Sequence, residues 1–278
     1  MITNNSNFFK DLLQSVDYEH YSKEILMNSL LDEIINNPNQ SIQYKEANQK
    51  VRNEPIKAEV GDLARIMHIT KELKIKTILE FGSGKSTNCL AYQLNENKKK
   101  YENIVAGSLR TGQAWKLFSI ETSPVWLENT KSQIKPEFKN IIEFSLCSVV
   151  MSTFNDLICT YYQDLPNCRP DLIYLDGPDQ FDPNNHIRGI STNHEDRMPM
   201  SADILSIEYF LEPGCIIIVD GRSANAMMLL NNLQRNWHYE YFKDYDQHFF
   251  LLNEAPLGVF NEKGINFHFG GIGNQKLT

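Results

Sequence analysis

The chain of 278 residues is long enough to bury a full hydrophobic core, and it suits one large α/β domain with an additional segment. Its 27 Lys and Arg residues are outnumbered by 35 Asp and Glu residues, and the formal net charge of −8 argues against a surface that neutralises nucleic-acid phosphates. No apolar run is long enough to cross a bilayer. We therefore expect neither nucleic acid nor a membrane as a partner.

The five cysteines of the chain suggest a reducing compartment. Their number is odd and no two of them are spaced as C-x-x-C, so the sequence predicts neither a disulfide framework nor a zinc site. The first residues lack the basic and apolar regions of a secretory signal. The sequence therefore predicts a cytoplasmic protein.

The first part of the chain is predicted to be helical. Residues 8–37 carry apolar side chains at helical spacing, and residues 38–58 are polar with two prolines. We predict an N-terminal helical appendage and its linker over residues 1–58, followed by a core domain over residues 59–278. The appendage could cover an active site or form the interface of a homo-oligomer. Its tyrosines could either pack or offer a stacking surface for a sugar: Tyr18, Tyr21 and Tyr44.

Strands and helices alternate through the core domain, after a first helix that opens at Gly61 and ends near residue 73. The predicted strands are 76–81, 116–121, 140–146, 171–176 and 215–220, and the helices between and after them are 85–95, 124–134, 201–211 and 223–235. This alternation predicts a Rossmann-like, doubly wound α/β fold with a mostly parallel sheet. Two last strands, 237–242 and 248–252, flank turn residues and predict a C-terminal antiparallel hairpin.

A glycine-rich loop follows the first strand, in the segment T-I-L-E-F-G-S-G-K-S-T at 77–87. A loop of this kind lets the start of a helix meet a polar or anionic ligand group at close range. A P-loop would need a glycine where Leu79 stands, and a dinucleotide fingerprint would need a third glycine where Thr87 stands. Both interpretations of the segment as a phosphate-binding loop are therefore weakened.

The loop resembles the first motif of class I S-adenosylmethionine (SAM)-dependent methyltransferases, E-x-G-x-G-x-S/T. By that resemblance the glycines lie against the methionine part of the cofactor, and the acid of the motif orients its amino group directly or through water. The residues that the resemblance assigns to cofactor binding are Glu80, Gly82, Ser83, Gly84, Ser86 and Thr87.

The end of the second strand supports the same cofactor. Glu121 could accept hydrogen bonds from both ribose hydroxyls, with Thr122 beside it and Ser148 after the third strand as further cofactor contacts. In a typical Rossmann fold the acidic residue follows the glycine loop by ~20 residues. Glu121 follows the loop by more residues than this, and we attribute the difference to an insertion near residues 96–113. The segments 171–179, 200–205 and 216–222 resemble a group of bacterial methyltransferases, many encoded with polysaccharide-assembly genes.

Polar clusters at the later strand ends are the candidates for the chemistry. Asp176 is the first choice as general base or metal ligand, and Asp179 and His186 are the alternatives. Arg222 could hold an anionic group of the substrate or pair with a neighbouring carboxylate. The long polar loop 180–199 suggests a substrate lid.

Asp176 and Asp220 together resemble the carboxylate pair with which catechol-type O-methyltransferases hold Mg²⁺, although Gly221 stands where that family often has Asn. The sequence thus predicts a SAM-dependent methyltransferase acting on a hydroxyl oxygen of a small-molecule or saccharide acceptor, with Mg²⁺ as an optional second cofactor. Two alternatives stay open: a P-loop-like nucleotide-dependent kinase and a non-catalytic SAM-binding protein.

Overall fold

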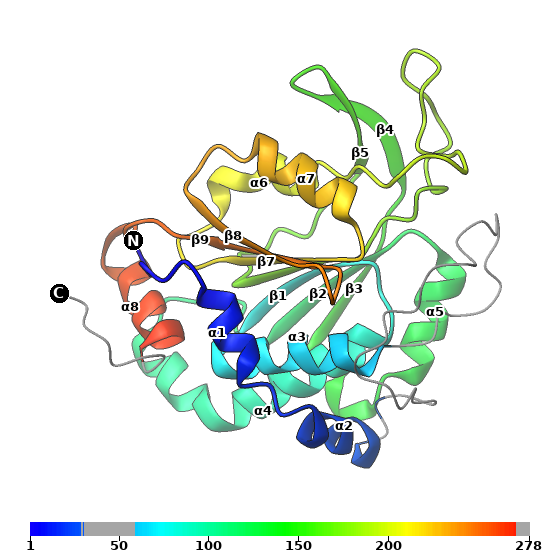
Figure 1. Ribbon diagram of the computed structural model, residues 1–278. Coiled ribbons are helices and arrows are strands. Elements are labelled where there is room, and N and C mark those ends of the chain that lie inside the picture. Colours follow the sequence, from blue (N-terminus) through cyan, green and yellow to red (C-terminus); the bar gives the residue numbers. More distant parts are fainter. Residues whose placement is uncertain (29, 31–58, 271–278) are drawn as a thin grey trace.

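The computed structural model describes residues 1–28, 30 and 59–270, and at its centre is a seven-stranded sheet with the order β3-β2-β1-β6-β7-β9-β8 (Figure 1). A two-stranded sheet of β4 and β5 stands apart from it. The strands are β1 Thr77–Phe81, β2 Lys116–Glu121, β3 Ile142–Leu146, β4 Val149–Phe154, β5 Leu157–Tyr162, β6 Leu172–Leu175, β7 Ile216–Asp220, β8 Trp237–Phe242 and β9 Gln247–Leu252.

The direction of the strands confirms the predicted fold class. Strands β3, β2, β1, β6 and β7 run parallel to one another. The last strand, β9, inserts antiparallel between β7 and β8, and β8 and β9 form the predicted C-terminal hairpin. The domain therefore has a doubly wound, mostly parallel α/β sheet that ends in an antiparallel hairpin.

Helices cover both faces of the sheet (Figure 1). In Figure 1, α3 and α4 lie below the sheet, whereas α6 and α7 lie above it. The helices are α1 Phe8–Gln14, α2 Tyr18–Met27, α3 Val60–Glu72, α4 Lys85–Ser108, α5 Pro124–Gln133, α6 Asp203–Ile207, α7 Ser223–Asn232 and α8 Gly258–Phe269, with short 3₁₀ turns at Pro136–Phe138 and Glu208–Phe210. Among the described helices, none is both long and apolar enough to cross a membrane.

Each central strand feeds two hydrophobic cores, because successive side chains of a strand point to opposite faces. In β7, Ile216 and Ile218 belong to the core between the sheet and helices α1 and α3. Ile217 and Val219 belong to the core between the sheet and helices α6 and α7. All four are fully buried. Burial on both faces explains why the sequence of this strand is a continuous apolar run without alternation.

The N-terminal helices pack into the same core as the sheet. Phe9 and Tyr21 are buried in the cluster that contains α3 and the central strands. The first turn of α1 is held by β8, because the backbone N–H groups of Phe9 and Lys10 donate to the Glu240 carboxylate at 2.7 and 3.0 Å. The remaining part of the predicted appendage, with its linker and Tyr44, lies outside the described residues, so the boundary at residue 58 stays a prediction.

Three segments differ from the sequence-based prediction. Helix α4 runs for 24 residues, so most of the expected insertion near 96–113 is helix, fastened where Asn97 donates to the carbonyls of Thr70 and Ile75 at 2.8 and 2.9 Å. The β4–β5 hairpin was not predicted, although Asn155 and Asp156 form its turn with φ values of 48° and 65°, which these residue types tolerate. Helix α8 was also not predicted.

Candidate functional site

The loop between β1 and α4 has one crowded glycine and one open glycine. Gly82 has φ +90°, and a Cβ atom there would lie 3.0 Å from the carbonyl oxygen of Asp176. Gly177 faces it across the gap between β1 and β6, since a Cβ on Gly177 would lie 2.7 Å from the Gly82 nitrogen. A Cβ on Gly84 would meet no atom within 4 Å. The close strand packing therefore requires Gly82, whereas Gly84 borders open space.

Glu80 lies beneath this loop and is fully buried. Its carboxylate accepts hydrogen bonds from the hydroxyls of Ser86, Thr87 and Ser119, each at 2.7 Å. Burial raises the pKa of Glu80 to about 7, and the three hydroxyls act in the opposite direction. Glu80 thus ties β1, β2 and the start of α4 together, and its contact with a cofactor amino group stays a prediction.

Glu121 at the tip of β2 faces the same loop. One carboxylate oxygen accepts from the backbone N–H of Ser83 at 3.0 Å, and the other accepts from the N–H groups of Thr122 and Ser123 at 2.8 and 2.9 Å. These bonds fix the carboxylate at the carboxyl end of the sheet, where a ligand of an open α/β sheet binds. The hydroxyls of Ser83 and Thr122 also donate to it, at 3.2 Å each, and its contact with the ribose hydroxyls of a cofactor stays a prediction.

The end of β3 lies directly beside Glu121. The backbone N–H of Cys147 donates to the Glu121 carbonyl at 2.8 Å, and Ser148 follows as an exposed residue whose carbonyl accepts from Gln163 at 2.9 Å. The structure therefore brings the predicted cofactor residues to the ends of three adjacent parallel strands. They are Glu80, Gly82, Ser83, Gly84, Ser86 and Thr87 at β1, Glu121 and Thr122 at β2, and Ser148 at β3.

Arg222 clamps the turn that follows β6. Its guanidinium donates to the carbonyls of Pro178, at 2.6 Å, and Asp176, and its Nε lies 3.4 Å from a carboxylate oxygen of Asp176. The Arg222 side chain is 15% exposed and that of Asp176 is 51% exposed. Of the two roles considered for Arg222, the structure shows pairing with the neighbouring carboxylate.

Asp176 combines accessibility with a perturbed acidity. The pKa of Asp176 is raised, chiefly because the surrounding protein displaces water, and Asp220 adds to the rise while Arg222 opposes it. Solvent reaches half of the Asp176 side chain and limits this rise, and its role as general base stays a prediction.

The described residues do not fit the expected magnesium site. Asp220 accepts from the Tyr174 hydroxyl and from Gln247 at 3.2 Å, while Asp176 lies against the cationic Arg222. No group of three or more His, Cys, Asp or Glu side chains within the described ranges could hold a metal ion. A divalent cation prefers several unengaged oxygen ligands, so we derive no step through Mg²⁺.

The other two catalytic candidates lie in the loop after β6. Asp179 accepts from the backbone N–H of Phe181 at 3.0 Å, which closes a local turn next to the strand ends. The neighbour of His186, Asn185, pairs with both backbone groups of Met151 in β4 at 2.7 and 2.9 Å. These bonds hold the loop against the β4–β5 hairpin. His186 itself is exposed, and its catalytic role stays a prediction.

Sequence reasoning missed two residues of this region. Asp182 accepts from the Thr122 hydroxyl at 2.9 Å, and burial raises its pKa to about 6. The hydroxyl of Tyr162 is buried without a hydrogen-bond partner among the described residues. The acidic spacing D-x-x-D at 179–182 was a signal for Asp182. No local signal marks Tyr162, because its position depends on the β4–β5 hairpin.

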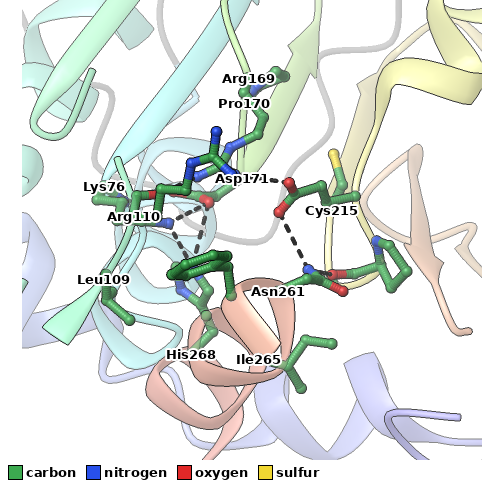
Figure 2. A pocket seen from close by; sticks show the side chains of 15 residues that line it. Lys76, Leu109, Arg110, Arg169, Pro170, Asp171, Cys215, Asn261, Ile265 and His268 are labelled. Carbon is green, nitrogen blue, oxygen red and sulfur yellow. Dashed lines mark hydrogen bonds and ion pairs between the residues drawn. The ribbon is translucent and has the colours of Figure 1, made fainter. Parts of the chain in front are cut away.

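A cavity of about 30 Å³ lies at the opposite edge of the sheet, before the first residues of β1, β6 and β7 (Figure 2). Lys76 Nζ lies 2.5 Å from Asp171 Oδ1, and His268 Nε2 lies 3.3 Å from the same oxygen. Burial alone would raise the pKa of Asp171, but Lys76 and His268 together lower it. Because these polar groups satisfy one another and the cavity has room for little more than water, we assign it a structural role.

Comparison with protein-family models finds no match for this chain, and comparison with curated protein sequences finds none either. Among solved structures, an O-methyltransferase from Bacillus cereus in complex with SAH aligns at 12% identity and a TM-score of 0.36, over 91% of this chain and 100% of that chain. NSun6 from Pyrococcus horikoshii with SFG aligns at 13% identity and a TM-score of 0.30, over 68% of this chain and 52% of that chain. At such scores the function must be inferred from the site itself.

Proposed function

We propose that this protein is a SAM-dependent methyltransferase that transfers a methyl group to a hydroxyl oxygen of a small-molecule or saccharide acceptor. The observation that carries the proposal is the open side of Gly84 at the start of α4, next to the Glu121 carboxylate at the tip of β2. This pairing offers close backbone approach and an acceptor for ribose hydroxyls at the carboxyl edge of a parallel sheet.

The site residues divide the work between binding and proton transfer. When bound, the cofactor supplies an electrophilic sulfonium methyl group. Glu121 accepts from the ribose hydroxyls, and the Gly82–Gly84 loop receives the amino-acid part. Asp176 accepts the proton of the acceptor hydroxyl, which suits its raised pKa. Arg222 keeps the Asp176–Pro178 turn in place, since methyl transfer depends mainly on positioning.

A ligand panel tests the cofactor class. Thermal shift and isothermal titration of the full chain with SAM, S-adenosylhomocysteine (SAH), ATP and NAD should show stabilisation by SAM and SAH only. Binding of ATP with no binding of SAM or SAH would overturn the proposal and favour the nucleotide-dependent kinase. Binding of SAH without turnover of any hydroxyl acceptor would favour the non-catalytic alternative.

Two variants separate binding from chemistry. Glu121→Ala should weaken SAH affinity at least tenfold, because hydrogen bonds to a charged group contribute about 1.5–3 kcal/mol. Asp176→Asn should retain SAH affinity and lose turnover in an assay of SAH release with hydroxyl-bearing acceptors. Glu128→Ala, on an exposed part of α5 with a side chain that is 72% exposed, is the matched control. Unchanged SAH affinity in Glu121→Ala would refute the ribose assignment.

A further inference from the structure

The chain that follows β6 passes the carboxyl end of β1 and reaches the end of β2. The backbone N–H of Asp176 donates to the carbonyl of Phe81, the last residue of β1, at 3.0 Å, and Asp182 accepts from the Thr122 hydroxyl, just after β2, at 2.9 Å. Because these strands are ordered β2-β1-β6, residues 176–182 lie along the start of the glycine loop. This segment therefore borders the place where the proposed function puts the cofactor.

Asp182 and Glu121 meet at one hydroxyl group. The Thr122 hydroxyl oxygen lies 2.9 Å from Asp182 Oδ2 and 3.2 Å from Glu121 Oε1. A hydroxyl carries a single proton, so it cannot donate a full hydrogen bond to both carboxylates at once. Two carboxylate oxygens from segments 60 residues apart in the chain therefore compete for one donor, and a ligand that brings further donors to this place would satisfy both.

The second carboxylate oxygen of Asp182 is available to a ligand. The hydrogen bonds that this side chain accepts within the described residues come from Thr122 and from the backbone N–H of Asp179 at 2.8 Å, and both go to Oδ2. Oδ1 is not one of the described polar atoms that are buried without a partner, so solvent reaches it. Burial raises the pKa of Asp182 only to about 6. At neutral pH the group is therefore mostly ionised and accepts hydrogen bonds.

We propose that Asp182 is a second binding residue for the ribose of the cofactor and accepts a hydrogen bond from one ribose hydroxyl, beside Glu121. This inference rests on the proposed function, which assigns Glu121 to the ribose. The ribose is favoured over other parts of the cofactor because Asp182 and Glu121 share the Thr122 hydroxyl. The two neighbouring hydroxyls of a ribose supply two donors, which matches two carboxylates that share one donor in the unliganded protein.

Isothermal titration of the full chain with SAH and with its 2′-deoxy and 3′-deoxy analogues tests this inference. Asp182→Ala should bind SAH about tenfold more weakly than the wild type, the effect expected for the loss of one hydrogen bond to a charged group. For one of the two deoxy analogues, the variant and the wild type should bind equally, because the ligand already lacks the hydroxyl that Asp182 contacts.

Two further variants guard the test against effects on folding. Asp196→Ala removes an acid of the same loop whose side chain is 92% exposed, and it should leave the affinity for all three ligands unchanged. Asp182→Asn keeps the size of the side chain and removes its charge. It should show the same dependence on the ribose hydroxyl with a smaller loss, and it replaces Asp182→Ala if the alanine variant unfolds.

The outcomes separate this inference from the proposed function. Equal SAH affinity of the Asp182 variants and the wild type overturns the inference and leaves the proposed function standing. The same loss of affinity for SAH and for both deoxy analogues also overturns it, because Asp182 then acts only through the fold of its loop. A wild type that does not bind SAH refutes the proposed function, and the inference falls with it.

Discussion

Buried carboxylates have shifted pKa values of opposite direction at the two edges of the central sheet, the one where its parallel strands begin and the one where they end. At the edge where the strands begin, Asp171 meets Lys76 and His268, and its pKa is lowered. At the edge where the strands end, Glu80 and Asp203 meet hydroxyl and backbone N–H donors, and burial raises the pKa of each to about 7. The comparison shows where the protein uses charge for stability and where it tolerates an unfavourable charge, a pattern typical of binding sites.

The largest expected effect comes from removing the Asp171–Lys76 ion pair, at the edge where the strands begin. Asp171→Asn leaves Lys76 buried without its counter-ion, which should lower the free energy of unfolding at pH 7 by about 3–5 kcal/mol. Urea unfolding measures this quantity. The folded pKa of Asp171 is lowered, so its contribution is present above the unfolded pKa and is lost as the pH falls.

The surface pair Lys116–Glu143 is the matched control for this prediction. Its atoms are 2.7 Å apart, and its side chains are 34% and 51% exposed. Glu143→Gln should change stability by no more than about 1 kcal/mol. Equal losses in Asp171→Asn and Glu143→Gln would contradict the difference drawn between the two edges.

A second prediction concerns the unfavourable charge at Glu80. Its folded pKa of about 7 lies above the unfolded value of 4.5, so the folded protein holds the proton more tightly and stability falls as the pH rises through this window. Glu80→Gln lacks this ionisation. Relative to the variant, the wild type should lose on the order of 3 kcal/mol between pH 4.5 and pH 7.

Urea unfolding across this pH range measures the difference. Glu128→Gln, whose side chain is 72% exposed, should follow the wild type at every pH. Parallel pH curves for the wild type and Glu80→Gln would show that Glu80 does not titrate in this window.

The smallest expected effect on stability distinguishes the two glycines of the cofactor loop. Gly82→Ala should destabilise the protein by about 1–3 kcal/mol, because its φ of +90° and the nearby Asp176 carbonyl leave no room for a Cβ atom. Gly84→Ala should change stability by less than about 0.5 kcal/mol, since it borders open space. Its SAH affinity should nevertheless fall, because the methyl group occupies the ligand side. Unchanged affinity in Gly84→Ala would place the cofactor elsewhere.

Much of the fold could be predicted from local patterns. The apolar runs at 172–175 and 216–219 are strands β6 and β7 because both faces of these strands are covered. The β4–β5 hairpin was not predicted, because its strands lie outside the main sheet and interrupt the expected alternation. The residue types Asn155 and Asp156 did indicate a turn. The length of α4 was missed because its polar stretch is the exposed face of a helix that Asn97 anchors.

The sequence by itself determined the class of the fold, the glycine loop at 82–84 and the acid at the tip of β2, because strand periodicity and short motifs are local properties. Only the tertiary structure decided that Glu80 is enclosed by three hydroxyls, that Arg222 clamps the turn after β6, and that Tyr162 reaches the Gly82–Gly177 junction. The first two depend on which strand ends are neighbours in the order β3-β2-β1-β6-β7, and the position of Tyr162 depends also on the separate β4–β5 hairpin. That order follows from packing between segments far apart in the chain, which no local pattern records.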